Sequence, residues 1–318
     1  MKKICFAWLA VAAGCTTGGT TDTVDPSAPV ADTDATTIPA AAETRADFVL
    51  TPSGYYHKDC VVDVGDDAVL EGDGSVTKSD GTRVALPACA HGHYASLDEI
   101  GANAVAEPEA VVPAVNGWVE DLNKWAADWY KKVTATWSVP TSPSHYAKQT
   151  VFFFPGFQPG DASTIVQPVL QYGPSAAGGG EYWAISSWDC NKSCPHSTLK
   201  RVAVGDVIEG TAAGSSCTNG GACTWTITTK DKTSGASTTL TRKAAKMEWA
   251  AVSLEAYNIT SCSEYPSSGA ESFDISVENG NGTTSTAAWT KWSPAHVPHC
   301  DYTVGSPDHS HAYLYWNH

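Results

Sequence analysis

The sequence is short of basic residues and of long apolar runs. Lys and Arg number 19 against 34 Asp and Glu in 318 residues, which gives a formal net charge of −15. Nucleic-acid binding needs clustered Lys and Arg to contact phosphates, so this composition argues against DNA or RNA as a partner. A membrane-spanning helix needs about 20 consecutive apolar residues, and no stretch of the chain provides them.

Two common catalytic signatures are missing as well. The sequence has no Gly-x-Ser-x-Gly turn, which disfavours an α/β-hydrolase, and no His-Glu-x-x-His helix, which disfavours a zinc peptidase. Charged residues make up only 17%, whereas 12 Trp, 12 Tyr and 27 Gly are present. This balance is typical of exported, β-rich proteins. Nothing in the sequence points to a bound cofactor, and we expect none.

The first residues have the layout of an export signal. Two lysines follow Met1, an apolar run extends from Ile4 to Ala13, and Gly14-Cys15 comes next. Val11-Ala12-Ala13-Gly14-Cys15 resembles the lipobox of bacterial lipoproteins, which implies cleavage before Cys15 and its lipidation. We therefore expect 1–15 to be a lipoprotein signal peptide and the protein to be anchored at the bacterial outer membrane or cell surface. An ordinary cleaved signal is the alternative.

Eight cysteines remain once Cys5 and Cys15 are set aside, and an even number suits an oxidising compartment. Eight cysteines allow 105 pairings. Sequence alone does not settle the connectivity, and pairing between sequence neighbours is one plausible arrangement: Cys60–Cys89, Cys190–Cys194, Cys217–Cys223 and Cys262–Cys300. A zinc site using His196 or His299 is the rival interpretation, and it is disfavoured in an exported acidic chain. We also expect His309 and His311 to be solvated, and so no metal site.

The chain divides by composition into a tether and two folded regions. Residues 16–46 are rich in Thr, Ala, Asp, Pro and Gly, and predict a disordered tether. Residues 47–112 predict a small disulfide-closed β module and linker, with hairpin turns at Asp73-Gly74 and Asp80-Gly81. Residues 113–318 contain many short strand patterns separated by turns, which predict an all-β, antiparallel two-sheet sandwich. The spacing of Trp118, Trp125 and Trp129 fits either a helix or a strand.

Two strand patterns carry polar residues that suit chemistry. Alternation over 165–173 puts Gln167 and Gln171 on one face, which favours a polar groove over a buried core. In 247–255, Glu248 shares a face with Ala250, Val252 and Leu254, so it is a candidate general base in a desolvated site. Glu255 lies on the opposite face and is expected to be a solvated or a supporting group.

Five segments resemble the eqolisin family of glutamic peptidases in the same order. They are Asn116-Gly117-Trp118, 135–140 (Ala-Thr-Trp-Ser-Val-Pro), Val169-Leu170-Gln171-Tyr172-Gly173, Val204-Gly205-Asp206 and Lys246-Met247-Glu248-Trp249. Each motif is short, and the order gives the set its weight. One departure is that Phe152-Phe153-Phe154 stands where eqolisins have a Trp-Val-Gly segment beside the site.

The resemblance implies a concanavalin A-like jelly roll with a catalytic dyad in its concave face. Carried over by motif, Gln171 would be the dyad amide and Glu248 the base of an endopeptidase acting on polypeptides at acidic pH. The protein is expected to be a monomer. Five residues are expected to contact the substrate. The substrate-binding candidates are Gln167, Trp137, Phe153, Trp183 and Glu181.

Other interpretations of the same residues stay open. Gln167 could be the dyad amide in place of Gln171. Glu181 could pair with Glu248, in a site that resembles the neprosin-type glutamic peptidases. A non-catalytic lectin-like sandwich that binds glycans predicts exposed aromatics such as Trp183 and Trp188, and a surface interaction protein predicts a concave face filled by apolar side chains.

Overall fold

The structure, a computed structural model, describes residues 43–86, 89–100, 114–218 and 221–318. The described chain is almost entirely β-strand, with four single-turn 3-10 helices, as the all-β prediction requires. The first strands are β1 (Phe48–Thr51), β2 (Gly54–His57), β3 (Val61–Asp63), β4 (Ala68–Leu70), β5 (Ser75–Thr77), β6 (Arg83–Ala85) and β7 (His93–Tyr94). The strands of the sandwich are β8 (Val115–Ser138), β9 (Thr150–Gln158), β10 (Ile165–Ser175), β11 (Gly178–Cys190), β12 (Cys194–His196), β13 (Lys200–Arg201), β14 (Val207–Ser215), β15 (Ala222–Asp231), β16 (Ser237–Ala245), β17 (Met247–Ile259), β18 (Ala270–Asn279), β19 (Thr290–Trp292), β20 (Thr303–Gly305) and β21 (His311–Tyr315).

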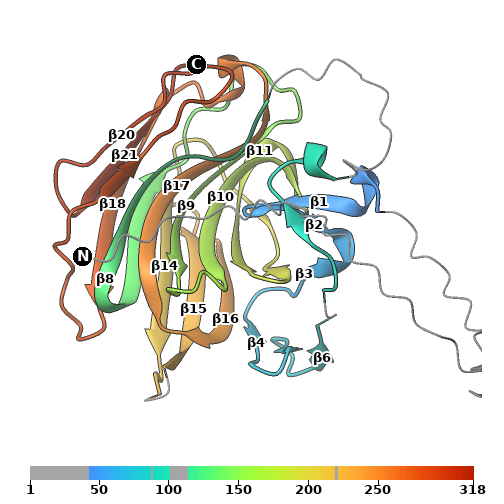
Figure 1. Cartoon of the computed structure of the whole chain (residues 1–318), viewed down its shortest axis with the longest axis vertical. Helices are drawn as coiled ribbons and strands as arrows, with labels where there is room; N and C mark the ends of the chain where they lie inside the picture. The colour runs from blue at the N-terminus through green and yellow to red at the C-terminus, as the bar shows by residue number, and fades with distance from the viewer. Residues whose placement is uncertain (1–42, 87–88, 101–113, 219–220) are drawn as a thin grey trace, which may run out of the picture. The chain divides into compact units, whose positions relative to one another are not determined.

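The long strand β8 belongs to both layers of the sandwich (Figure 1). Its first half pairs with β17, and its second half pairs with β14 and β18. We call β11, β10, β9, β17 and the first half of β8 layer 1. Layer 2 consists of β18, the second half of β8, β14, β15 and β16. The tryptophans that fitted either a helix or a strand, Trp118, Trp125 and Trp129, therefore lie on a strand.

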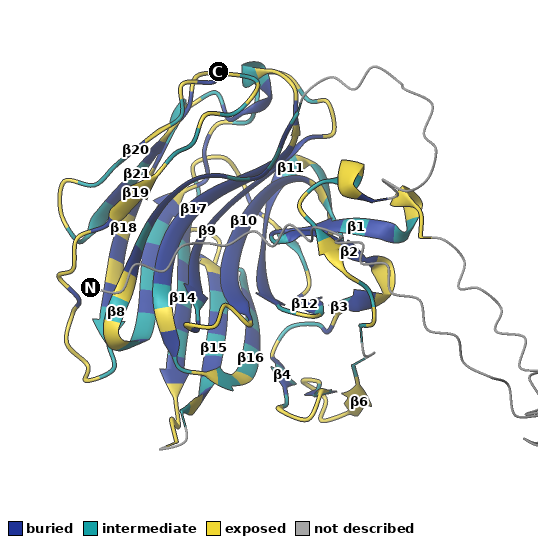
Figure 2. Cartoon of the chain, viewed as in Figure 1, coloured by how far each residue is buried: buried dark blue, intermediate teal, exposed yellow. Residues whose placement is uncertain are grey.

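The two layers are buried differently (Figure 2). In layer 2, buried and partly exposed residues alternate along β14, β15 and β18, as expected for a sheet with one face in solvent. In layer 1, eight of the nine residues of β9 are buried in succession, and β10, β11 and β17 contain similar runs. Layer 1 is therefore covered on both faces, and something other than layer 2 must cover its outer face.

The two faces of layer 1 pack into two separate apolar clusters. The main core fills the space between the layers and includes Trp137, Phe153, Trp183, Trp225 and Leu254. The second cluster lies on the outer face of layer 1. It combines residues from β9, β10, β11 and β17 with residues from the N-terminal strands: Phe152, Phe154, Val169, Trp188 and Tyr257 pack with Phe48, Leu50, Tyr55 and Tyr56.

The N-terminal region forms a three-stranded sheet, β1-β2-β7, and also extends the sandwich. Strand β3 pairs in parallel with β12, and β4 pairs in parallel with β16, so the strand pairing is not purely antiparallel. The two predicted hairpins are present. Gly74 and Gly81 both have positive φ, which suits glycine, in the β4–β5 and β5–β6 turns.

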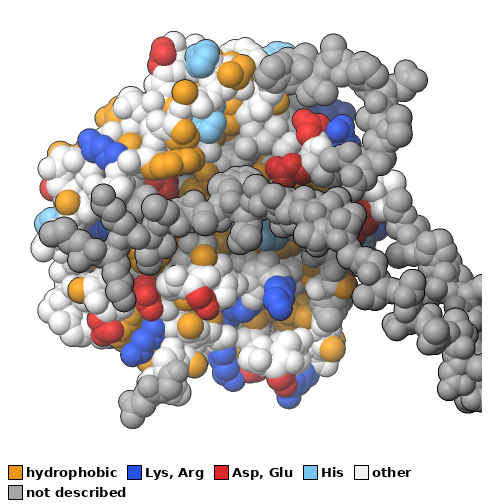
Figure 3. Space-filling model, viewed as in Figure 1, with side chains coloured by type: hydrophobic (Ala, Val, Ile, Leu, Met, Phe, Trp, Pro, Cys, Tyr) orange, Lys and Arg blue, Asp and Glu red, His pale blue; other side chains and the backbone are white. Residues whose placement is uncertain are grey.

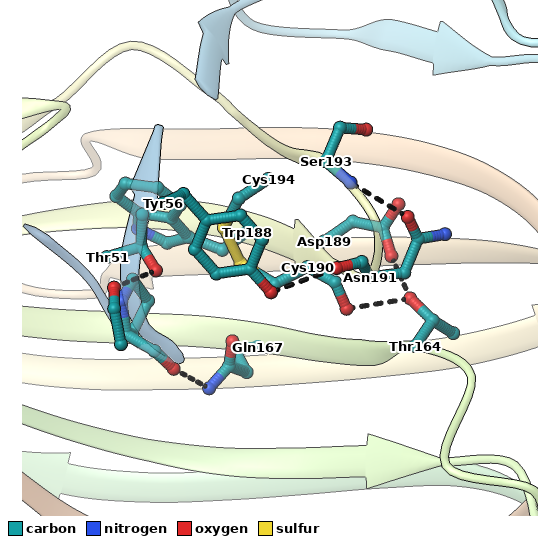
Figure 4. Close-up of a disulfide and its surroundings, with 12 residues drawn as sticks. Thr51, Tyr56, Thr164, Gln167, Trp188, Asp189, Cys190, Asn191, Ser193 and Cys194 are labelled. Carbon is teal, nitrogen blue, oxygen red and sulfur yellow. Dashed lines mark hydrogen bonds between the residues drawn. A yellow bond between two sulfur atoms is a disulfide. The ribbon is translucent and has the colours of Figure 1, made fainter. Parts of the chain in front are cut away.

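All four neighbour pairings of the cysteines are present as disulfides. Cys190–Cys194 closes a short loop that faces the N-terminal strands (Figure 4). Because all eight of these sulfurs are paired in disulfides, none of them is a thiolate that could bind the zinc ion considered above.

Several sequence predictions concern residues outside the described ranges. These are the signal peptide, the lipidation of Cys15, the tether as far as residue 42, and the linker segment 101–113. Within the described ranges, no helix has the length and apolar character needed to cross a membrane.

Candidate functional site

Among the buried polar residues on the outer face of layer 1, four come from β10 and β17. Gln167 and Gln171 come from β10, and Ser253 and Glu255 come from β17. Strand alternation puts each pair on one side of its strand. We call this surface the polar face.

Glu255 and Gln171 lie in one cross-strand row. Phe152 on β9 is the register partner of Gln171 on one side and of Glu255 on the other. Directly opposed residues project from the same side of a sheet, so the three side chains share the polar face. The backbones of Gln171 and Glu255 are two strand spacings apart, roughly 10 Å, with the Phe152 ring between them.

Glu255 is a carboxyl group with little solvation. Its residue is 1% exposed, and Oε1 accepts a 2.5 Å hydrogen bond from the hydroxyl of Tyr257. No described residue bonds to Oε2. Burial raises the pKa of Glu255 from 4.5 to about 8, against the opposing effect of the Tyr257 hydrogen bond. Of the two expectations for Glu255, a solvated or a supporting group, the structure contradicts the first.

The side chain of Gln171 is fixed by the hairpin between β10 and β11. Its Nε2 donates to the carbonyl oxygens of Gly173, at 2.7 Å, and Gly178, at 3.0 Å. Its Oε1 accepts a bond of 2.9 Å from the hydroxyl of Ser175. Every polar atom of the amide is thus satisfied, and the head group is held at the hairpin end of the polar face.

Glu248 does not meet Gln171. It lies near the start of β17, exposed, with its carboxylate against Gly160. Seven residues separate Glu248 from Glu255, the residue level with Gln171, and at about 3.3 Å per residue this is roughly 23 Å along the strand. The structure therefore does not form the dyad expected from the sequence, because the two residues lie at opposite ends of layer 1.

Gln167, the alternative dyad amide, contacts the N-terminal strands. Its Nε2 donates a bond of 2.7 Å to the backbone carbonyl of Pro52, in the turn between β1 and β2 (Figure 4). Gln167 Oε1 and Ser253 Oγ, like Glu255 Oε2, have no hydrogen-bond partner among the described residues. Buried polar groups are normally paired with protein or water, and nine further side-chain atoms elsewhere in the described ranges, both oxygens of Glu120 among them, also have no partner. The three atoms on the polar face suit a surface built to meet water or a polar ligand.

Strands β1, β2 and β7, which we call the cover, lie over the polar face. Tyr55 makes an edge-on contact with Tyr257, with ring centroids 5.5 Å apart, and its hydroxyl accepts a 3.3 Å bond from the amide of Asn258. The hydroxyl of Tyr56 donates a 2.9 Å bond to the carbonyl of Asn191 (Figure 4). These contacts close the polar face from above and explain why layer 1 is buried on both sides.

Cavities remain on two sides of the cover. One of about 240 Å³ is lined by Leu50 and Tyr55 of the cover and by Thr150 and Ser175 of layer 1. The other, of about 680 Å³, is lined by Tyr56 and His93 of the cover and by Trp118, Ile165 and other residues. The two cavities lie at opposite ends of β9 and β10, and together with the surface under the cover we call them the depression.

The other substrate-binding candidates lie away from the polar face. Trp137, Phe153 and Trp183 are buried in the main core, on the opposite side of layer 1, so they cannot contact a ligand there. Glu181 is exposed near the hairpin end of β11, while Glu248 is at the other end of layer 1, so this carboxylate pair is not formed either. Trp188 is fully buried, and neither it nor Trp183 provides the exposed aromatic surface that a lectin-like groove needs.

Surface charge does not single out this site. On the side of the molecule drawn in Figure 3, exposed Asp and Glu side chains are interspersed with Lys and Arg. The polar face is distinguished by the cross-strand row of Glu255, Phe152 and Gln171 rather than by a patch of one sign. Sequence analysis found Gln167 and Gln171 by strand alternation, and it missed Glu255 because the cover comes from a distant segment.

No protein-family model matches the chain, and no curated protein matches it. Solved structures with a similar fold include scytalido-glutamic peptidase with a peptide-based transition state analog (14% identity, 63% of this chain and 98% of that chain, TM-score 0.49). Another is SCP-B, a member of the eqolisin family of peptidases, in complex with the tripeptide Ala-Ile-His. It is 14% identical, the match covers 63% of this chain and 98% of that chain, and the TM-score is 0.47. At these values the likeness concerns the fold and carries no argument about activity.

Proposed function

We propose that this chain is an exported, lipid-anchored endopeptidase of the glutamic type whose active surface is the polar face. The observation that carries the proposal is the row Glu255–Phe152–Gln171, which puts a carboxyl group and an amide on one buried face. The unpartnered Oε2 of Glu255 supports it, because a general base needs a free oxygen that can reach water.

In the proposed reaction, ionised Glu255 takes a proton from a water molecule that attacks the scissile carbonyl carbon. The amide of Gln171 turns from the hairpin carbonyls and donates an N–H to the developing oxyanion. Removing one such donor typically lowers kcat by about 10²–10³-fold. Protonated Glu255 then gives its proton to the leaving amine, which restores the carboxylate.

The cover would keep this site inactive in two ways. It occupies the space above Gln167, where a substrate would lie, and its burial of the site keeps the pKa of Glu255 at about 8. Below that pH the carboxyl is protonated and cannot act as a base. Displacement of the cover would rehydrate Glu255, lower its pKa and open the depression to an extended polypeptide, which would allow activity in acid.

The experiment measures casein cleavage from pH 3 to pH 8 by the full chain, before and after nicking by an added protease that is then removed. We expect activity to rise after nicking of the cover, with Glu255→Gln and Gln171→Leu reducing it by at least 10²-fold. Glu248→Gln is the matched control, since Glu248 is an exposed carboxylate of the same strand and should leave activity unchanged.

Two results would contradict the proposal. One is nicked protein, with the cover lost and the sandwich intact by circular dichroism, that cleaves nothing in the whole pH range. The other is activity that Glu248→Gln abolishes and Glu255→Gln leaves intact, which would return the role of base to the residue first expected from the sequence.

A further inference from the structure

A group of metal-binding side chains lies in the N-terminal region, outside the polar face. His57 ends β2, Asp59 belongs to the 3-10 helix Lys58–Cys60, and His91 follows Cys89. One ligand atom of each lies within 4.8 Å of the others, the single such group among the described residues. We propose that His57, Asp59 and His91 bind one divalent transition-metal ion, of which zinc is the first choice.

The three ligand groups lie close together, but their side chains are not yet in a binding arrangement. The rings of His57 and His91 stack with centroids 3.7 Å apart and planes 11° from parallel, so one ring must turn before the lone pairs of both can point to a common ion. Nδ1 of His57 is 3.6 Å from Oδ2 of Asp59. Two ligands on a tetrahedral zinc ion, with bonds of about 2.0–2.2 Å, are roughly 3.3–3.5 Å apart. Rotation of the half-buried His91 ring and of the exposed Asp59 side chain is needed to complete the set of ligands.

A second carboxylate orients one of the histidines. Nδ1 of His91 lies 2.5 Å from Oε1 of Glu43, so the proton of the neutral ring belongs on Nδ1 and the lone pair of Nε2 is free. Metal-bound histidines commonly have such a carboxylate partner on the other ring nitrogen, which fixes the tautomer and strengthens the ligand. For His57, the competing bond to Nδ1 is a long one, 3.3 Å from the backbone N–H of Asp59.

The surrounding charges leave the site negative. Asp59 and Glu43 supply two carboxylates, while the basic side chains of the same stretch bond elsewhere: Lys58 to Asp47 and Arg45 to Asp98, each at 2.8 Å. Two imidazoles and a carboxylate suit zinc, nickel or copper better than calcium or magnesium, which prefer oxygen ligands. His57 is buried and Asp59 is exposed, so an ion has a path in from solvent.

The site joins segments that position the cover. His57 is the last residue of β2, Glu43 precedes β1, and the disulfide Cys60–Cys89 links the segments of Asp59 and His91. A bound ion would therefore crosslink the segments that carry β2 and β7 beside this disulfide. The metal site itself does not depend on the proposed peptidase activity.

The test uses the full chain, stripped with EDTA and titrated with ZnCl₂ by calorimetry at pH 7.5. We expect one ion per chain at micromolar or tighter affinity. Zinc at 100 times its Kd should raise the midpoint of thermal unfolding by about 5 °C or more. His91→Ala should abolish binding, and Glu43→Gln should weaken it about 10–100-fold. His309→Ala, outside the site, should bind as the wild type does.

The buried position of His57 makes its own substitution a weak test, because the cover could unfold. His91 is half-buried and Glu43 is exposed, so their variants can be checked for an intact Cys60–Cys89 disulfide and native circular dichroism. Absence of zinc binding at 100 µM, or unchanged affinity in folded His91→Ala and Glu43→Gln, would overturn the proposal.

Discussion

Gln167, on the central strand β10, donates a hydrogen bond of 2.7 Å to the carbonyl of Pro52, which lies 115 residues earlier in the chain. This bond joins the polar face directly to the turn of the cover. An amide of the candidate site thus already holds a peptide carbonyl, the group that a polypeptide substrate would present there.

Gln167→Leu should loosen the cover while leaving the sandwich folded. The substitution leaves the buried Pro52 carbonyl without its donor, which costs about 1–3 kcal/mol. Amide hydrogen exchange should then become faster in β1 and β2 and stay slow in β14 to β16. Gln149→Leu is a matched control, because Gln149 bonds to the 145–147 loop and Glu264 rather than to the cover. Equal protection of β1 and β2 in wild type and Gln167→Leu would argue against the role of this bond.

The stability of the protein should fall between about pH 4.5 and pH 8. The pKa of Glu255 is raised from 4.5 to about 8 by burial, so the folded state keeps a proton that the unfolded state releases in this window. Burial also raises the pKa of Glu271, to about 8, and of Glu120, to about 9, in the same direction. Glu255→Gln should make the decline shallower, as measured by urea unfolding at each pH.

The exposed Glu181→Gln is the control for that measurement, and its stability should follow the wild-type curve with pH. An unchanged slope in Glu255→Gln would mean that Glu255 is hydrated in the folded protein, contrary to its 1% exposure.

Removal of Cys60–Cys89 should cost more stability than removal of Cys217–Cys223. The two disulfides span sequence separations of 29 and 6. The loss of chain entropy in the unfolded state predicts that the first stabilises the fold by about 3–4 kcal/mol and the second by about 2 kcal/mol. The paired Cys→Ser variants can be compared by urea unfolding and by binding of a hydrophobic dye. Only the first should expose the second apolar cluster, because Cys60–Cys89, unlike Cys217–Cys223, lies beside the cover. Dye binding that is equal in both variants would count against this account.

Arg242→Met should destabilise the protein by about 3–5 kcal/mol, because it leaves a buried carboxylate without its cation. Asp189 is fully buried, and its other side-chain partner is the hydroxyl of Thr164, at 2.6 Å. Burial raises the pKa of Asp189 even with Arg242 present, and loss of the arginine should raise it further. The destabilisation should therefore be larger at pH 8 than at pH 4.

The double variant Arg242→Met, Asp189→Asn removes the unpaired charge and should recover most of the loss. Urea unfolding of the two variants at both pH values checks the prediction. A loss in Arg242→Met that is independent of pH would show that packing of the arginine stem matters more than the charge pair.

The amino-acid sequence by itself determined the local features of this protein. Period-two alternation and turn residues predicted the all-β class and the hairpins at Gly74 and Gly81, and neighbour spacing made the four disulfides one plausible pairing. Alternation also put Glu255 on the face of β17 opposite Ala250 and Val252, which the structure confirms, since those two residues lie in the main core. Each of these inferences needs only neighbouring residues, because side-chain direction in a strand follows from the backbone.

Only the tertiary structure decided which of these faces is solvated. Alternation can assign Glu255 to a face of β17, but burial of that face depends on the cover, about 200 residues away in sequence. Likewise, strand pairing rather than motif order made Glu255, and not Glu248, level with Gln171, because register across β9 is a long-range property. Burial and register are set by contacts between distant segments, and a short motif carries no information about them.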